Sequence, residues 1–172
     1  LPRPKMRCLL VLLFAPLVCC QRTVTVLNNC DHNVTVVRRI YEQGFFKYQA
    51  VFKKLPPGGS ATDELLFGFL HDGVGYKSGL TGKTIAKFGK VRKHLLGPQK
   101  YNYEIESVWG MDMPMTISSL FPSNLTSIHC YDEGCSKGEQ YTGIQHFLLT
   151  FCIPWELTST TSTTSTTTTA AP

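Results

Sequence analysis

The clearest pattern along the chain is a series of short apolar or β-branched segments, several of which alternate with polar residues. Such alternation is typical of strands that bury one face. The turn-forming run Leu55–Ser60, with two prolines and two glycines, separates two of these segments. No segment sustains a long helical period, so we expect a mainly β fold, either a sandwich or a barrel. The predicted strands are Thr23–Leu27, Val34–Ile40, Leu65–Leu70, Tyr103–Trp109 and Phe147–Phe151.

The first twenty residues have the composition of a secretory signal peptide. Met6 is the expected start, and Arg7 precedes the apolar run Cys8–Val18. A short basic head, an apolar stretch of this length and small residues after it predict cleavage near Cys20. The alternative is an uncleaved membrane anchor, although a membrane span needs about 20 apolar residues. We therefore assign residues 1–20 to the signal region and predict a secreted, extracellular protein without a transmembrane segment.

The C-terminal segment is a tract of serine and threonine. Every residue of Thr158–Thr169 is one of these two types, so the tract has no apolar face with which to offset the entropy of ordering. We predict a mucin-like, O-glycosylated tail over residues 156–172, with a bare disordered tail as the alternative. A longer stalk or a lipid-anchor signal beyond Pro172 is left open. One domain, residues 21–155, lies between the two ends.

Composition and charge narrow the class of protein further. Hydrophobic residues make up 42% of the chain and charged residues 17%, which is enough apolar material for a buried core. The signal region holds three basic residues and no acid, so its removal lowers the net charge from +5 to +2. A charge this small does not predict general attraction to nucleic acid or membrane.

Cysteines supply the covalent frame of the predicted domain. Three of the seven lie in the signal region, which leaves Cys30, Cys130, Cys135 and Cys152. Four cysteines in an oxidising compartment allow three pairings. We favour Cys30–Cys152, which ties the start of the domain to its end, and Cys130–Cys135, which closes a short loop containing a glycine. Closing the long loop removes about 4–5 kcal/mol of unfolded-state entropy in the chain-entropy model.

A zinc site is the alternative role for two of these cysteines. Its four candidate ligands would be Cys130, Cys135, His129 and His146. The CxxxxC spacing and the secretory route argue against such a site, so we predict no metal and no cofactor.

Two sequons support export. Asn33 and Asn124 each begin an Asn-x-Thr acceptor pattern, and we predict that both are N-glycosylated.

Motifs for catalysis are missing, but one segment is strongly basic. The chain has no complete phosphate-binding loop, dinucleotide turn or GxSxG elbow. The segment Lys83–Lys100 carries six lysines and arginines, with no acid among them. We favour a solvated loop for this segment, with binding to a polyanion such as a sulfated polysaccharide as the alternative.

Several landmarks resemble thaumatin-like proteins and occur in the same order. Thr25–Cys30 is similar to that family's opening strand, and Leu55–Ser60 resembles its Leu-x-Pro-Gly-x-Ser turn. Tyr103–Met115 resembles the segment Tyr-Asp-Ile-Ser-x-Val-Asp-Gly-Phe-Asn-x-Pro-Met, and Phe147–Pro154 resembles the closing Tyr-x-Val-x-Phe-Cys-Pro. The resemblance spans about residues 23–154 and implies a single-domain thaumatin-like β-sandwich. The family also joins its first and last cysteines, and the low cysteine number is similar to that of its small members.

The resemblance also implies a ligand cleft. Antifungal members of the family carry an acidic cleft that binds or weakly hydrolyses β-1,3-glucan. By position, Glu104 stands for one of its acids, while Trp109 and Lys87 stand where others would be, and Asp112 completes the candidate cleft. Because one carboxylate cannot supply the usual two-carboxylate chemistry, we assign no catalytic residue. Trp109 would offer a sugar a stacking face, with a core or interlobe position as the alternative.

Together these features predict a secreted, monomeric binding protein with a defence or host-interaction role, which acts on an extracellular glycan or protein. A β-1,3-glucan hydrolase is one alternative. A structural glycoprotein whose mucin-like tail carries the role is another.

Overall fold

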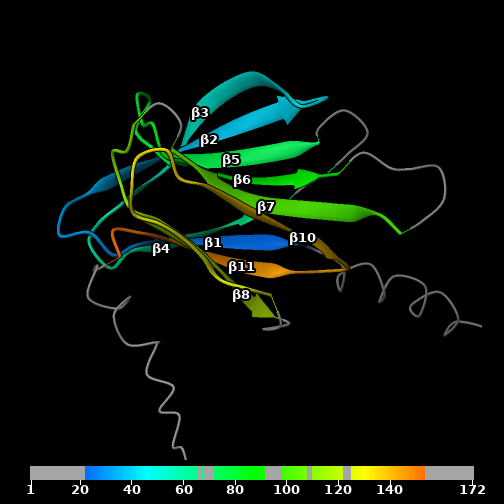
Figure 1. Cartoon of the computed structure of the whole chain (residues 1–172). Helices are drawn as coiled ribbons and strands as arrows, with labels where there is room; N and C mark the ends of the chain where they lie inside the picture. Colours follow the sequence, from blue (N-terminus) through cyan, green and yellow to red (C-terminus); the bar gives the residue numbers. More distant parts are fainter. Residues whose placement is uncertain are drawn as a thin grey trace, which may run out of the picture.

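The computed structural model is built of two β-sheets that pack face to face (Figure 1). It describes residues 22–65, 67, 72–91, 98–107, 110–121 and 125–153. The predicted signal region and mucin-like tail lie outside these residues. Every regular element in the described residues is a strand, and none of these residues forms a helix long and apolar enough to cross a membrane. The mainly β sandwich expected from the sequence is confirmed.

Eleven strands make up the two sheets. The five-stranded sheet has the order β4-β1-β11-β8-β9, and the six-stranded sheet has the order β10-β7-β6-β5-β2-β3. The strands are β1 (Thr23–Asn28), β2 (Val34–Glu42), β3 (Phe45–Leu55), β4 (Ser60–Glu64), β5 (Gly73–Ser78), β6 (Ile85–Lys90), β7 (Lys100–Glu106), β8 (Met115–Phe121), β9 (Ile128–Cys130), β10 (Ser136–Thr142) and β11 (His146–Phe151).

The first and last strands lie next to each other at the centre of the five-stranded sheet. β1 pairs with β11 in parallel, with Val24 opposite Phe147 and Val26 opposite Leu149. All four of these side chains are fully buried. The alternation that predicted the two strands therefore arises because every second residue enters the core between the sheets.

The proline- and glycine-rich turn connects the two sheets. Leu55 ends β3 in the six-stranded sheet, and Ser60 begins β4 in the five-stranded sheet. Gly58 has a φ of 71°, a backbone conformation that glycine adopts without strain. A Cβ atom at Gly59 would lie 2.7 Å from the Pro56 ring. The expected turn is thus the corner of the sandwich, and its residue types fit the tight path of the chain.

Two predicted strands differ from the structure. The third predicted strand, Leu65–Leu70, lies mostly outside the described residues. Leu65 and Phe67 are described and belong to no strand, although both pack against the core. The strand predicted over Tyr103–Trp109 is β7, which begins earlier, at Lys100, and ends at Glu106. It ends there because the next residue, Ser107, forms hydrogen bonds outside the sheet: its hydroxyl donates to the Asp132 carbonyl and accepts from the Cys135 N–H.

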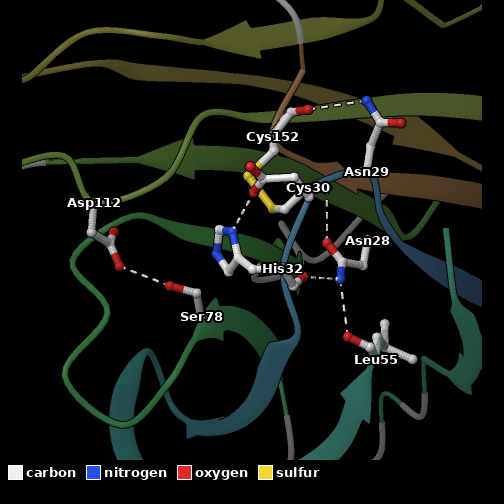
Figure 2. The surroundings of a disulfide bond; sticks show 9 residues. Asn28, Asn29, Cys30, His32, Leu55, Ser78, Asp112 and Cys152 are labelled. Atoms are coloured by element: carbon white, nitrogen blue, oxygen red, sulfur yellow. Dashed lines mark hydrogen bonds and ion pairs between the residues drawn. A yellow bond between two sulfur atoms is a disulfide. The ribbon is translucent and has the colours of Figure 1, made fainter. Parts of the chain in front are cut away.

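Both disulfides have the favoured pairing. Cys30 is bonded to Cys152, which lie 122 residues apart in the chain, and Cys130 is bonded to Cys135. Beside the first bond, the buried side chain of Asn28 accepts a hydrogen bond from the backbone N–H of Cys30 (Figure 2). Disulfides of this kind fit an oxidising compartment.

Candidate functional site

The candidate site lies on the outer face of the six-stranded sheet. Tyr103 and Ile105 of β7 are fully buried in the core, so the residues between and beside them point to the opposite face. Those residues are Asn102, Glu104 and Glu106, all partly exposed.

Lys87 of β6 brings a positive charge between the two glutamates. Its register partner is Glu104, and the Lys87 Nζ atom lies 3.8 Å from Glu104 Oε1. The same ammonium contacts the Glu106 carboxylate more closely and donates a hydrogen bond to it. The three side chains thus form one ion cluster with a formal charge of −1.

The pKa of one carboxyl group in this cluster, that of Glu104, is raised. Burial raises the pKa of Glu104 above its ordinary value, and the nearby charge of Glu106 raises it further, while the Lys87 ammonium opposes both effects. A carboxyl group whose pKa is raised takes up a proton more readily and can then donate a hydrogen bond.

A hollow of about 200 Å³ opens beside this cluster. Its floor includes Gly73 of β5 and Gly89 of β6, which are register partners. Because glycine has no side chain, this pair adds no side-chain atoms to the hollow. The lining consists of Tyr41, Gly44, Asp72, Gly73, Lys87, Phe88, Gly89, Lys90, Asn102 and Glu104.

The two glycines keep the hollow open. A Cβ atom at Gly89 would lie 2.7 Å from Asn102 Oδ1, and one at Gly73 would lie 3.3 Å from the Tyr41 Cβ atom. Either added side chain would push against a residue that lines the hollow.

The wall of the hollow combines one aromatic ring with several polar groups. Tyr41 of β2 is half-buried on the outer face, and burial raises the pKa of its hydroxyl. The Lys87 Nζ atom lies 5.7 Å from the centre of the Tyr41 ring, within the range of a cation–π interaction. Asp72 adds a buried Oδ1 atom that has no hydrogen-bond partner among the described residues. The hollow thus offers a ring face together with hydrogen-bond donors and acceptors.

Asp112 does not lie in this hollow. Its carboxylate accepts a hydrogen bond from the Ser78 hydroxyl (Figure 2). It also accepts hydrogen bonds from the backbone N–H groups of Lys83 and Thr84. Burial alone would raise the pKa of Asp112, but these hydrogen bonds hold it below its ordinary value. Ser78 ends β5 and Gly73 begins it, so Ser78, which binds Asp112, lies about 17 Å along the strand from Gly73 on the floor of the hollow. Asp112 therefore stabilises the loop between β5 and β6 through these hydrogen bonds.

The remaining predicted site residues are only partly described. Trp109, Asn124 and residues 92–97 of the basic segment lie outside the described residues. Asn33 is exposed immediately before β2, so its sequon is accessible. Glycosylation at Asn33 and Asn124, sugar stacking on Trp109 and polyanion binding by Lys83–Lys100 stay predictions.

The alternative of a zinc site that uses Cys130 and Cys135 is wrong. Cys130 and Cys135 are bonded to each other, so neither supplies the thiolate that zinc requires. His129 and His146 each pair through Nδ1 with a threonine hydroxyl, from Thr116 and Thr23 respectively. The described residues contain no cluster of three or more potential metal ligands.

Sequence reasoning missed several residues of the site. Glu106 could have been found, because it lies two residues from Glu104 on the predicted strand and must share its face. Asn102 also shares that face, but it precedes the predicted start of the strand at Tyr103. Tyr41 and Asp72 carry no such signal. Tyr41 reaches the hollow through its pairing with Gly73, and Asp72 through backbone hydrogen bonds to Tyr41 and Lys90.

Comparison with known proteins supports the fold. No protein-family model matches the chain, and no curated protein matches its sequence. Among solved structures, the protein elicitor MoHrip2 from Magnaporthe oryzae is 20% identical and matches with a TM-score of 0.54, over 77% of this chain and 99% of that chain. The thaumatin-like xylanase inhibitor TLXI is 17% identical, with a TM-score of 0.48, over 76% and 99% of the two chains.

Proposed function

From the premise that the fold is thaumatin-like, we propose that the chain is an extracellular binding protein that holds a neutral glycan in the glycine-floored hollow. Its role is in defence or host interaction. The observation that carries this proposal is the hollow itself, where a tyrosine ring, an amide, carboxylates and ammonium groups surround a floor without side chains.

The chemistry of the wall favours a neutral sugar. Sugar rings present apolar C–H faces that pack on aromatic rings, and Tyr41 supplies such a ring. Sugar hydroxyls both donate and accept hydrogen bonds, so they suit Asp72 and Glu104 as acceptors and Lys90 as a donor. A strongly anionic ligand would meet two carboxylates at close range. A volume of about 200 Å³ is below the roughly 300–1,000 Å³ of drug-sized pockets and suits one ring of a longer polysaccharide.

A specific observation also favours hydrolysis as a second candidate function. Glu104 and Glu106 lie on one face, and the pKa of Glu104 is raised, as expected of a general acid in a glycosidase. The Lys87 ammonium, however, contacts both carboxylates. A glycosidase places the scissile bond between its two carboxyl groups, and here the lysine occupies that position. Binding without cleavage is therefore the function we propose.

The test measures binding and cleavage in the same tubes. Insoluble glycans, including β-1,3-glucan, xylan, cellulose and chitin, are incubated with the protein. Bound protein and released reducing sugar are then measured. We expect at least one neutral glycan to retain the wild type, with no release of reducing sugar.

Two variants and one control locate the site. Tyr41→Leu keeps the apolar bulk but removes the ring, and Asn102→Ala removes an amide from the wall; each should weaken binding at least tenfold. Gln140→Ala is the control, because Gln140 is the exposed partner of Asn102 on β10 and does not line the hollow. It should bind as the wild type does.

Three outcomes count against the proposal. Retention by no glycan leaves the structural-glycoprotein alternative. Equal binding by all variants places the site elsewhere, and Trp109→Ala in the same assay tests the predicted stacking residue. Release of reducing sugar that is lost in Glu104→Gln establishes the hydrolase.

A further inference from the structure

We propose that the edge of the β2–β3 hairpin is a docking surface for a protein partner that presents an extended segment rich in apolar and acidic residues. The exposed apolar residues of this edge, called here the hairpin patch, are Phe45, Phe46, Tyr48 and Val51. They project from both faces of the strand, because Tyr48 is the register partner of buried Ile40 and Phe46 is the register partner of Tyr41 on the outer face. The proposal is independent of glycan binding in the hollow.

The hairpin patch exposes unusually large side chains. Phe45 is 74% exposed, Phe46 48% and Tyr48 53%. With about 200 Å² for each aromatic side chain, these three expose roughly 350 Å². This area is divided between the two faces of β3, and an extended segment added at the strand edge would contact side chains on both. Aromatic residues and arginine are also the types enriched at protein interfaces, and the Arg39 guanidinium lies 4.2 Å from the centre of the Phe46 ring.

The hairpin patch lies on the outermost strand of its sheet. β3 pairs with β2 on one side, and no described strand pairs with its other side (Figure 1). An edge strand presents unpaired backbone N–H and C=O groups to which an extended segment can add. Two bulges, with Lys47 and Phe52 as the extra residues, leave Tyr48–Val51 as the longest uninterrupted run of pairing. A partner segment therefore has about four residues of backbone pairing beside it, and the exposed side chains supply further contact.

The charges of β3 decide which partner fits. The strand carries Lys47, Lys53 and Lys54 and no acidic residue. In the described structure Lys47 pairs at 3.0 Å with Glu42, across the hairpin. A second copy of the chain would bring six lysines and no acidic residue into the two adjoining edge strands, and this concentration of like charge is unfavourable. An acidic segment would instead be attracted, and its apolar residues would cover the exposed rings.

A sulfated glycan is the rival occupant, since it too would meet the lysines. Sulfate groups gain nothing from Phe45 or Val51, which are exposed by 74% and 52%. A segment of mixed acidic and apolar character accounts for both the charge and the exposed hydrophobic side chains.

The probe is a fluorescent 12-residue peptide of alternating leucine and aspartate, and its affinity for the full chain is measured by fluorescence anisotropy. The matched peptide replaces aspartate with lysine. At low salt we expect the acidic peptide to bind at least tenfold more tightly than the basic one, with affinity falling as salt rises.

Matched variants distinguish binding at this surface from nonspecific hydrophobic binding. Phe45→Ser should weaken binding of the acidic peptide at least tenfold. Phe121→Ser is the control, because Phe121 is 70% exposed on β8 of the other sheet, and it should leave binding unchanged. The double variant Lys53→Glu/Lys54→Glu should reverse the preference between the two peptides. None of these variants should alter glycan retention, so the two proposals can fail separately.

Several results would overturn the docking proposal. They are equal affinity for the two peptides, an equal effect of Phe45→Ser and Phe121→Ser, or glycan retention that is lost in Phe45→Ser. A concentration-dependent dimer in sedimentation that disappears in Phe45→Ser would assign the surface to a second copy. Heparin fragments that bind equally well to Phe45→Ser and displace the peptide would assign it to a polyanion.

Discussion

Replacing Asn28 with alanine removes a buried group that joins three parts of the chain beside the long-range disulfide (Figure 2). The Asn28 amide nitrogen donates to the carbonyl oxygens of His32 at 2.8 Å and Leu55 at 2.9 Å. Its amide oxygen accepts from the backbone N–H of Cys30 at 2.9 Å. The side chain is fully buried, so water does not replace it freely.

The expected cost follows from these three hydrogen bonds. Each contributes about 1 kcal/mol net, and a buried partner left without a hydrogen bond costs about 1–3 kcal/mol. We therefore expect Asn28→Ala to lower the free energy of unfolding by about 3 kcal/mol. Asn29→Ala is the control: the exposed side chain of Asn29 makes one hydrogen bond, to the Cys152 carbonyl, and its loss should cost less than about 1 kcal/mol.

Urea unfolding with the disulfides intact measures both variants. With an m-value of about 1.5 kcal/mol/M, the Asn28→Ala midpoint should fall by about 2 M at unchanged slope. Near-equal midpoints for the two variants would show that hydrogen bonding at Asn28 does not stabilise this corner of the fold, and the reasoning would be refuted.

Three further predictions concern charge and covalent structure. Asp112→Asn should lower the free energy of unfolding by about 1–3 kcal/mol at pH 7. Because the pKa of Asp112 is lowered in the folded state, the stabilisation by its carboxylate is present above the ordinary pKa of 3.8 and is lost as pH falls through the folded value. The stability of the variant should therefore fall less steeply with acid than that of the wild type, and an unchanged acid dependence would contradict this. The pKa of Glu104 is raised in the folded state, so the wild type should become less stable relative to Glu104→Gln as pH rises from the ordinary pKa of 4.5 through the folded value. Urea unfolding of the two proteins measures this, and a stability difference that does not change with pH would disprove the shift. Replacing Cys30 and Cys152 together by alanine should cost about 4–5 kcal/mol, because the closed loop spans 122 residues, and a loss below about 1 kcal/mol in thermal or urea unfolding would argue against that loop-entropy account.

The longest strand was absent from the sequence prediction for a physical reason. β3 runs from Phe45 to Leu55, yet most of its residues are exposed, and its two bulges break the alternation. The turn before it is a two-residue hairpin loop in which Gln43 and Gly44 have φ values of 53° and 82°, and Gly44 is its one residue of the type preferred in such loops. An edge strand without a buried face gives little periodic signal.

The sequence by itself determined the elements whose cause is local. Alternation placed β1 and β11, the proline–glycine run placed the corner between the sheets, and the position of the first and last cysteines of the domain favoured the Cys30–Cys152 pairing. These features depend on strand period, turn geometry and chain closure, all of which can be read along the chain. For the candidate site, the sequence predicted only that Glu104 and Lys87 lie in the same cleft, not that they are paired.

Only the tertiary structure decided where the hollow and the hairpin patch lie. The hollow exists because Gly73 is paired with Gly89 and Lys87 with Glu104. A shift of either register by one residue would turn these residues to the other face of the sheet. That register is selected by the burial of Phe88 and Tyr103 against the opposite sheet, an interaction between segments far apart in the chain that no local pattern encodes.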